Sequence, residues 1–564
     1  MSDKAGFHAI LENPPWEGID TSDKEFYAGF DISILNLKSE EEIEALIYQL
    51  NENHQIKDAR HKYDSDIQAY RNSTKIFFRH VNQGAKGTSG ATPDMYQCFA
   101  ERSVNLLCKF GSIGAVFSSA FHSVESSSGI RKLYLEKMAL RVCFSFENKK
   151  RLFEIHPSFK FPVVVADKTG ITDSFSCAFY LHEESWLFQD YKGDSLLTYS
   201  TDFIRKTTGE LLNFLELRTQ ESVPIIETIY ASKESTFGVL RRKWDIMPTE
   251  ELHTSKQRHR TKLISEIIQE FSGDPRKPEI QLPLLYEGII PVCKGEHFHQ
   301  YDALWGDVPE VATTVLSMRG KEQRVFASGF FRMVFRRQAS STNERTVITN
   351  VSVPGILYFD SALPERDPNI RQTWKALTIV SLCNSFCFDW VLRQIVSANI
   401  TFNYLDNAPT PHLKNIALLI SHLALRLTCN HSGYAPLWRE QLGDEWREPG
   451  KPPFTWPVLA TDDERWAVRA AIDAVVAQAY GLTRDQYAHV LSTFSHKSYP
   501  NALHLCLAAF DELTAIGLDA FTRKHDPYHD IPLNESLPKP VIDLPIPATT
   551  TKPQQGSLDL GALS

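Results

Sequence analysis

The sequence of 564 residues lacks the features that mark secreted, membrane-spanning and metal-binding proteins. Its nine cysteines include no C-x-x-C pair, and Cys383 and Cys387 lie four apart in an apolar stretch. That pattern is typical of reduced, buried thiols and not of disulfides or a zinc site. No basic-then-apolar leader opens the sequence, and no uncharged run approaches the roughly 20 residues of a membrane span. We therefore expect a cytoplasmic protein without a metal.

The sequence also lacks an excess of positive charge. The 60 Lys and Arg against 69 Asp and Glu give a formal net charge of -9, which excludes a protein whose whole surface is basic. Any nucleic-acid site must therefore be confined to one part of the surface. The length and the 42% hydrophobic composition are those of a globular protein with about two to four domains.

The first part of the sequence, residues 1–180, alternates short strands and helices. A strand is predicted from Phe7 towards Asn13, and a helix follows with Thr92 as its N-cap and Gly111 beyond its end. Further strands are predicted at 112–119, 140–148 and 159–167, with a helix at about 129–139. This order indicates an open α/β sheet with a reversed edge.

The remaining residues divide by texture into three further regions. Residues 181–415 read as mixed α+β, with basic clusters at 240–244 and 255–262, a β-rich stretch at 323–355 and an apolar helix at 374–396. Residues 416–533 read as helical, because Thr461 to Glu464 and Thr483 to Gln486 fit the capping-box spacing. Residues 534–564 are rich in Pro, Thr and Ser and are predicted to be a disordered tail.

The segment Asn13-Pro14-Pro15-Trp16 follows the first predicted strand. Each proline fixes φ and lacks an N–H, so the corner holds its carbonyls and the Asn13 side chain in one geometry. An exocyclic amine could donate one hydrogen bond to the Asn13 side chain and one to the Pro14 carbonyl. These two bonds would free the nitrogen lone pair for attack. Trp16 offers a ring face for a base, a contact worth about 1 to 3 kcal/mol. The corner is predicted to cradle an adenine; the alternative is a plain proline-rich turn.

An adenine inside a duplex reaches such a corner only after it is flipped out, at a cost of a few kcal/mol. A second aromatic wall is therefore expected from the stretch "FSFENKKRLFEIHPSFKF". We prefer Phe153, with Phe146 and Phe159 as alternatives. A phenylalanine beside a strand is otherwise usually a core residue.

In order along the chain, several stretches resemble adenine-specific DNA methyltransferases of the large single-chain type found in type IIG restriction-modification and in related BREX and DISARM phage-defence systems. They are "ILENPPWE", "DMYQCFAERSVNLLCKFGSIGAVFSSAF", "FENKKRLFEIHPSFKFPVVV", "LYEGIIPVCKGEHFHQYDALW", "ASSTNERTVITNVSVPG", "LCNSFCFDWVLRQIVSANITFNYLDNAPTP" and "AIDAVVAQAYGLTRDQY". The resemblance implies a Rossmann-like catalytic domain followed by a target-recognition domain, with S-adenosylmethionine as methyl donor and double-stranded DNA as substrate.

By position, the resemblance assigns Asn13, Pro14, Pro15 and Trp16 to the catalytic motif and Phe153 to the aromatic that closes over the flipped base. Asp94 lies where these enzymes place an acidic helix start near the methyl donor. An Asp in a first helical turn also favours the helix dipole, and that explanation stays open.

One expected element is missing from the sequence. In these enzymes the donor lies on a glycine-containing turn well before the Asn-Pro-Pro-aromatic motif, whereas only twelve residues precede Asn13. The expected fold is therefore the C-terminal part of the methyltransferase sheet, from strand four onward, completed by an upstream-encoded polypeptide. A split enzyme, a truncated gene model and a pseudo-enzyme all fit this pattern.

Four arginines are candidates for DNA binding. Arg332, Arg336 and Arg337 lie in the β-rich stretch, and Arg345 follows a few residues on. Strand alternation places Arg332 and Arg336 on one strand face. Together with the separate cluster at 255–262, these arginines would neutralise phosphates. The alternative is a solvated charged surface.

The expected function is thus adenine-N6 DNA methylation by direct transfer, without a covalent intermediate or a metal. One rival is a DNA-binding subunit of a phage-defence complex that is catalytically inactive. Another is a methyltransferase acting on glutamine in a protein, against which the long arginine-bearing extension argues.

Overall fold

A computed structural model describes residues 6–83, 92–189, 193–339, 343–394, 400, 402–542 and 544. The chain divides into two compact units, Met1–Glu227 and Thr228–Ser564. The first unit contains the hydrophobic clusters around Phe146 and around Tyr27, and the second contains those around Ile290 and around Ile289. The fold is mixed α and β, with several sheets.

The first unit is built on a six-stranded sheet in the order β1-β2-β4-β3-β5-β6. Its strands are β1 (Phe7–Glu12), β2 (Leu107–Val116), β3 (Ala139–Glu147), β4 (Lys160–Asp167), β5 (Ser174–Leu181) and β6 (Leu197–Ser200). β1 pairs parallel to β2, and β3 parallel to β5, whereas β4 is antiparallel to both β2 and β3. The strands β1, β2, β3 and β5 therefore run in one direction, and their carboxyl ends lie at one edge of the sheet.

Two sequence-based expectations about this sheet are wrong. The reversed strand, β4, lies inside the sheet between β2 and β3 and not at its edge, because it forms ladders on both sides. The first region does not end at residue 180, because β5 and β6 continue the same sheet to Ser200.

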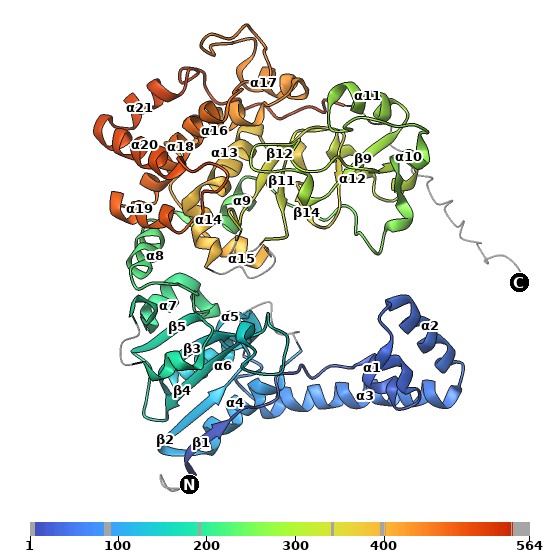
Figure 1. The fold of residues 1–564 in the computed structure, drawn as a ribbon, viewed down its shortest axis with the longest axis vertical. Coiled ribbons are helices and arrows are strands. Elements are labelled where there is room, and N and C mark those ends of the chain that lie inside the picture. Colours follow the sequence, from blue (N-terminus) through green and yellow to red (C-terminus); the bar gives the residue numbers. More distant parts are fainter. Residues whose placement is uncertain are drawn as a thin grey trace, which may run out of the picture. The chain divides into compact units, whose positions relative to one another are not determined.

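The helices of the first unit are α1 (Asp23–Ala28), α2 (Glu40–Asn51), α3 (His54–Phe77), α4 (Met95–Leu106), α5 (Ala120–Ser123), α6 (Ser128–Glu136) and α7 (Thr201–Thr208). Figure 1 shows α3 extending away from the sheet, with α1 and α2 at its far end. These three helices share a small apolar core around Tyr27, Ile34 and Ile56.

The start of α4 differs from the prediction. Its N-cap is Asp94 and not Thr92, because Asp94 keeps an extended backbone and forms an antiparallel bridge with Gly18. At its other end α4 stops at Leu106, and β2 begins at Leu107, five residues before the predicted strand start at Ser112.

Within its described residues, the second unit contains three small sheets, in the orders β13-β9-β10-β8, β12-β11-β14 and β15-β7. Their strands are β7 (Ser235–Thr236), β8 (Thr261–Leu263), β9 (Ile289–Cys293), β10 (Val311–Thr314), β11 (Arg332–Arg336), β12 (Thr349–Ser352), β13 (Leu357–Tyr358), β14 (Ala362–Pro364) and β15 (Pro409–Thr410).

The helices of the second unit include α9 (Phe237–Lys243), α10 (Ile264–Ile267), α11 (Pro278–Tyr286), α12 (Glu322–Ser328), α13 (Thr373–Asn384), α14 (Phe386–Arg393), α15 (Phe402–Asn407) and α16 (Ala417–Thr428). They continue with α17 (Ala435–Leu442), α18 (Asp462–Ala479), α19 (Arg484–Ser492), α20 (Ala502–Ile516) and α21 (Leu518–His525). Figure 1 shows α16, α18, α20 and α21 grouped on the side of this unit away from β9 and α11. The helix α8 (Ser222–Ala231) spans the boundary between the units.

The apolar helix predicted at 374–396 is two helices. The chain bends by 61° between α13 and α14, because Ser385 is extended and its hydroxyl caps α14 by accepting from the Phe388 N–H. Residues 395–399 lie outside the described residues. Among the described residues, no single helix has the length and apolar character to cross a membrane, and only the bent pair α13–α14 meets that test when both helices are taken together.

The predicted regions 181–415 and 416–533 are not separate in the structure, since α13 packs on α16 and both belong to the second unit. The predicted tail is ordered at its start. The N–H of Val541 donates to the Gly329 carbonyl at 2.8 Å, and Leu544 is 6% exposed within the cluster around Ile290. Residue 543 and residues 545–564 lie outside the described residues.

Candidate active site

The corner Asn13–Trp16 directly follows β1, at the sheet edge where the parallel strands end. Asn13 and Pro15 are exposed, Pro14 is buried and Trp16 is half-buried. The Trp16 indole N–H donates to the Val116 carbonyl at 3.3 Å, at the end of β2. This bond fixes the indole edge of Trp16 to the sheet, and the Trp16 ring stacks on Phe161 with centroids 6.1 Å apart. The Asn13 side chain remains at the surface.

Phe153 comes to this corner from the loop between β3 and β4. Its ring centroid lies 6.2 Å from that of Trp16, with the ring planes at 81°, and 4.7 Å from that of Phe161. Both Phe153 and Trp16 are half-buried against the cluster around Phe146 and Phe161. The structure therefore brings together the two aromatic residues that the sequence reasoning selected.

The two alternatives to Phe153 occupy different environments. Phe146 is 2% exposed and stacks on Phe161 with centroids 5.8 Å apart, so it is a core residue. Phe159 is 53% exposed. Among the three, Phe153 is the one whose ring contacts Trp16.

Asn148, which the sequence reasoning missed, fixes the backbone of Phe153. Its side chain is fully buried; the amide oxygen accepts from the Phe153 N–H at 3.0 Å, and the amide nitrogen donates to the carbonyls of Phe153 at 2.9 Å and Ile155 at 2.8 Å. The loop is therefore held by one side chain. The signal in the sequence was an Asn at the end of a strand, five residues before the candidate aromatic.

Asp94 lies next to the residues that follow the corner. The Ile19 N–H donates to the Pro93 carbonyl at 3.0 Å, and the Met95 N–H donates to the Glu17 carbonyl at 2.9 Å. Asp94 forms a capping box with Gln97 at the start of α4, and burial raises the pKa of its carboxyl. Asp94 therefore lies at the helix cap, and its role near a methyl donor stays a prediction.

A charged network lies near the ends of β3 and β5. Glu216 accepts from Lys160 at 2.6 Å and pairs with the His122 ring at 3.0 Å, while Glu147 pairs with His182 at 2.9 Å. Burial alone would raise the pKa of Glu216, but the hydrogen bond from His122 and the charge of Lys160 lower it to about 2. The network therefore ties this end of the sheet together with ionised groups.

Two of the four predicted DNA-binding arginines are buried, and their assignment is corrected. The Arg332 side chain is 1% exposed and pairs with Glu251 at 2.6 Å. Arg345 is 7% exposed; its guanidinium pairs with Asp389 at 2.8 Å and lies 4.1 Å from the centroid of the Phe386 ring. Neither guanidinium reaches a phosphate from these positions.

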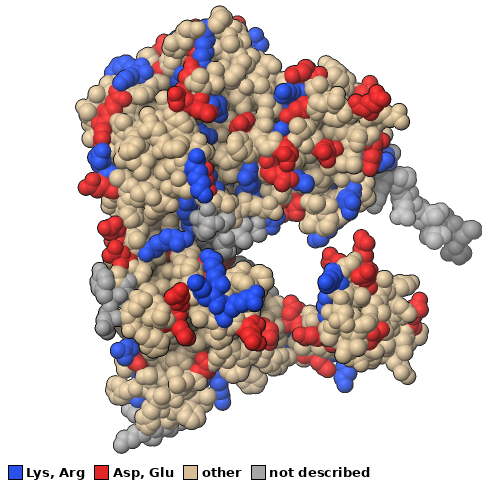
Figure 2. Space-filling model, in the orientation of Figure 1, with Lys and Arg blue, Asp and Glu red and all other residues tan. Residues whose placement is uncertain are grey.

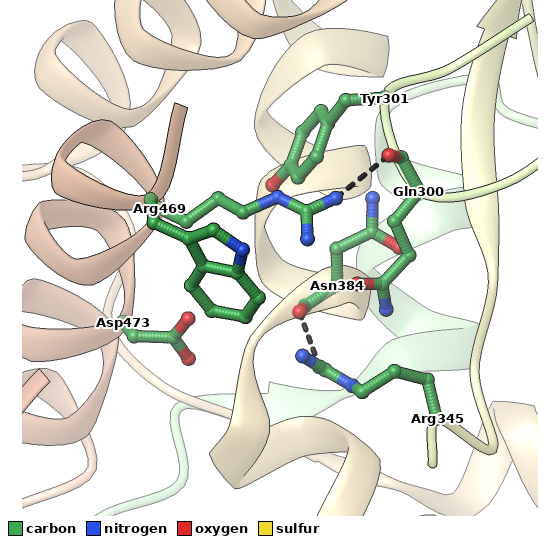
Figure 3. A pocket seen from close by; sticks show the side chains of 7 residues that line it. Gln300, Tyr301, Arg345, Asn384, Arg469 and Asp473 are labelled. Atoms are coloured by element: carbon green, nitrogen blue, oxygen red, sulfur yellow. Dashed lines mark hydrogen bonds between the residues drawn. The ribbon is translucent and has the colours of Figure 1, made fainter. Parts of the chain in front are cut away.

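Figure 3 shows where Arg345 lies, in a polar pocket of the second unit. The guanidinium donates to the Asn384 carbonyl, and Arg469 donates to the Gln300 carbonyl at 2.8 Å. Burial, the largest effect, raises the pKa of Asp473 in this pocket to about 6. Alternation along β11 predicted that Arg332 and Arg336 share a face, but not that this face is covered.

The other two arginines are more accessible. Arg336 is half-buried and donates to the Phe298 carbonyl. The Arg337 side chain is 39% exposed and pairs with Glu250 at 2.6 Å. DNA contact stays a proposal for these two residues.

The solved structures that match this chain include restriction enzymes and a modification subunit, all at low similarity. The type IIL restriction-modification enzyme MmeI in complex with DNA is 9% identical with a TM-score of 0.42, over 90% of this chain and 57% of that chain. The type ISP enzyme LlaGI with a DNA substrate mimic is 11% identical with a TM-score of 0.35, over 76% of this chain and 42% of that one. A modification subunit of a putative type I restriction enzyme from Vibrio vulnificus YJ016 is 12% identical with a TM-score of 0.21, over 36% of each chain.

The chain thus spans 36% to 57% of the length of these three structures. No curated protein sequence matches it. A family model does match the part of the chain that holds the corner and Phe153: residues 1–153 are similar to the Eco57I restriction-modification methylase family.

Proposed function

We propose that this chain is a polypeptide of an adenine-N6 DNA methyltransferase, in a restriction-modification or phage-defence system, that acts on a base flipped out of double-stranded DNA. The observation that carries the proposal is the meeting of the Asn13–Trp16 corner with Phe153 at the carboxyl edge of the sheet. The match of residues 1–153 to a restriction-modification methylase family supports it.

The chemistry assigned to the corner is positional and electrostatic. The Asn13 side-chain oxygen and the Pro14 carbonyl accept hydrogen bonds from the amino group of the adenine, which directs the nitrogen lone pair towards the incoming methyl group. As the bond to the methyl carbon forms, the nitrogen releases one proton to solvent. The rings of Trp16 and Phe153 stand nearly perpendicular, so a base stacked on one presents its edge to the other, a favourable aromatic geometry. No nucleophilic side chain is required.

S-adenosylmethionine, when bound, supplies the methyl group. Among the described residues near Asn13, only Asp94 was a candidate to hold it, and Asp94 caps α4. The resemblance assigned no other described residue to the donor. We propose that another polypeptide segment carries most of that site.

The edge of β1 offers a place for such a segment. Every residue of β1 is exposed or half-exposed, including Phe7 at 60% and Leu11 at 88%. Strands of parallel sheets are normally covered on both faces, and an open apolar edge pairs readily with another strand. We propose that the partner polypeptide adds its strand to β1.

A methyl-transfer assay with and without the candidate partner tests this function. Unmethylated DNA is incubated with methyl-labelled donor, the chain and the product of the upstream reading frame. We expect incorporation only with both polypeptides, and a loss of at least about 100-fold for Asn13→Ala, as when an electrostatic donor or acceptor is removed from an active site.

The matched control is Asn72→Ala, an exposed asparagine on α3, which should leave incorporation unchanged. Full incorporation with Asn13→Ala would contradict the role of the corner. The rival function, a catalytically inactive DNA-binding subunit, predicts DNA binding by the wild type without incorporation under any condition.

A further inference from the structure

Two basic segments that are distant in sequence meet in the second unit. One lies around the 3-10 turn Arg258–Arg260 and β8, and the other follows the 3-10 turn Leu316–Met318 and enters α12. They are adjacent because β8 pairs antiparallel to β10, with Lys262 opposite Ala312. We call the seven cations of these segments the basic surface: Lys256, Arg258, Arg260, Lys262, Arg319, Lys321 and Arg324.

Backbone carbonyls join the two segments. The Arg260 guanidinium donates to the carbonyls of Ser317 and Arg319, the latter at 3.1 Å. The Lys321 ammonium donates to the Glu251 carbonyl at 2.8 Å and to the Gln257 side chain. Arg324 also donates to the Glu251 carbonyl. These contacts fix Arg260, Lys321 and Arg324 in place without neutralising their charge.

Within the described residues, none of the seven cations of the basic surface is in an ion pair. The nearest carboxylates act on them only through charge: Glu251 on Lys321 and Arg324, and Glu322 on Arg319. Three buried guanidinium groups elsewhere in the same unit are in ion pairs instead: Arg332 with Glu251, Arg371 with Glu365 and Arg426 with Glu448. The acidic residue within the second segment, Glu322, accepts from the Gly320 N–H at 2.7 Å.

The crowding of positive charge has an electrostatic effect. Burial, followed by the charges of Arg324 and Arg260, lowers the pKa of Lys321 to about 8. An anion placed among these groups would relieve their repulsion. Lys256, Arg258, Lys262 and Arg319 are exposed and so can meet it.

We propose that the basic surface binds the phosphodiester backbone of duplex DNA. The proposal rests on the proposed function, which supplies duplex DNA as the polyanion. The rest of the molecule makes the surface distinctive: the net charge is -9, and on the face drawn in Figure 2 acidic and basic residues are interspersed over both units. A cluster of exposed cations around three held ones is suited to phosphates and not to bases, so it sets affinity and register.

The test compares two triple variants of the full chain in binding to a duplex oligonucleotide at several salt concentrations. The first variant is Lys256→Ala with Arg258→Ala and Lys262→Ala. The control is Lys497→Ala with Arg523→Ala and Lys539→Ala, which are also exposed residues of the second unit. Both remove three positive charges, and none of the six side chains makes a hydrogen bond or ion pair within the described residues.

Each lost phosphate contact reduces the slope of log K against log salt by about 0.9. We expect the first variant to lower the slope by about 2 to 3 and the affinity by at least tenfold, with the control close to the wild type. Equal slopes for the two variants overturn the proposal. A matching urea-unfolding midpoint for both variants shows that the fold is intact.

The two proposals fail in different ways. DNA binding with the expected slope change, but without methyl transfer in the presence of the partner, contradicts the methyltransferase function and supports the basic surface. Methyl transfer together with equal slopes contradicts the basic surface alone. A wild-type chain that does not bind duplex DNA at low salt overturns both.

Discussion

At the residue scale, the buried side chain of Asn148 holds the loop that carries Phe153. All three of its side-chain hydrogen bonds go to the backbone of the loop that carries Phe153. Asn148→Asp keeps the shape but replaces two donor hydrogens by an acceptor, which leaves the carbonyls of Phe153 and Ile155 unsatisfied. We expect a loss of about 1 to 3 kcal/mol in the free energy of unfolding, measured by urea denaturation.

The control for this variant is Asn72→Asp on the exposed face of α3, which should change stability by less than about 0.5 kcal/mol. Equal stabilities of the two variants would show that Asn148 does not hold the loop.

Glu216 gives a prediction about pH. Its pKa is about 2 in the folded protein, against an ordinary value of 4.5, so the folded state favours the ionised form. The resulting stabilisation is fully present above the unfolded pKa and is lost as the pH falls from about 4.5 towards 2. Glu216→Gln should therefore weaken the dependence of unfolding free energy on pH in that window, measured by denaturation at a series of pH values.

The exposed Glu184 provides the comparison. Glu184→Gln should retain the wild-type pH dependence between pH 4.5 and 2, and a Glu216→Gln profile that coincides with it would disprove the ionised network.

At the element scale, β11 shows why strand alternation alone misassigned the arginines. Alternation correctly placed Arg332 on one face of a strand, but that face is covered, and Glu251 supplies a buried partner from a distant segment. Arg332→Ala leaves the buried carboxylate of Glu251 without its ion-pair partner and should lower the free energy of unfolding by about 3 to 5 kcal/mol. Arg337→Ala removes an exposed pair and should cost less than about 1 kcal/mol. Urea denaturation of both variants distinguishes a structural arginine from a surface one.

The exposed edge of β1 gives a second prediction at this scale. Because Leu11 is 88% exposed on an edge strand, the isolated chain should self-associate, and Leu11→Lys should reduce that association. Leu316→Lys, at a residue that is 81% exposed in a 3-10 turn, should not. Sedimentation velocity at several protein concentrations measures the effect, and equal association of both variants would argue against an adhesive edge.

Helix starts and strands that depend on neighbouring residues in the sequence were predicted well. Both capping boxes, at Thr461 and Thr483, are confirmed, and the strand from Phe7 is confirmed with its end at Glu12. The break at Ser385 was missed, because an uninterrupted apolar run does not show where a hydroxyl will cap a new helix. The extended backbone at Asp94 was missed because it depends on pairing with Gly18.

At the scale of the whole molecule, tertiary contacts set the division of the chain into units, which composition did not predict. Four regions were expected, but the chain forms two units. The sheet of the first unit continues beyond residue 180, α16 packs on α13, and the helices after residue 416 belong to the second unit. The approach of Trp16 to Phe153 was expected from the resemblance, which assigned both residues to one site. The basic surface as a whole was not, because its second segment is joined to the first only by pairing between β8 and β10.

The central claim is that the corner at Asn13 activates the amine of a flipped adenine. Its most direct test is the identity of the modified base: the chain and its partner are produced in a host without DNA methylation, and the hydrolysed DNA is analysed by mass spectrometry of the nucleosides. N6-methyladenine that disappears with Asn13→Ala is the predicted result. Unmodified adenine, or methylation found only on cytosine, would contradict it.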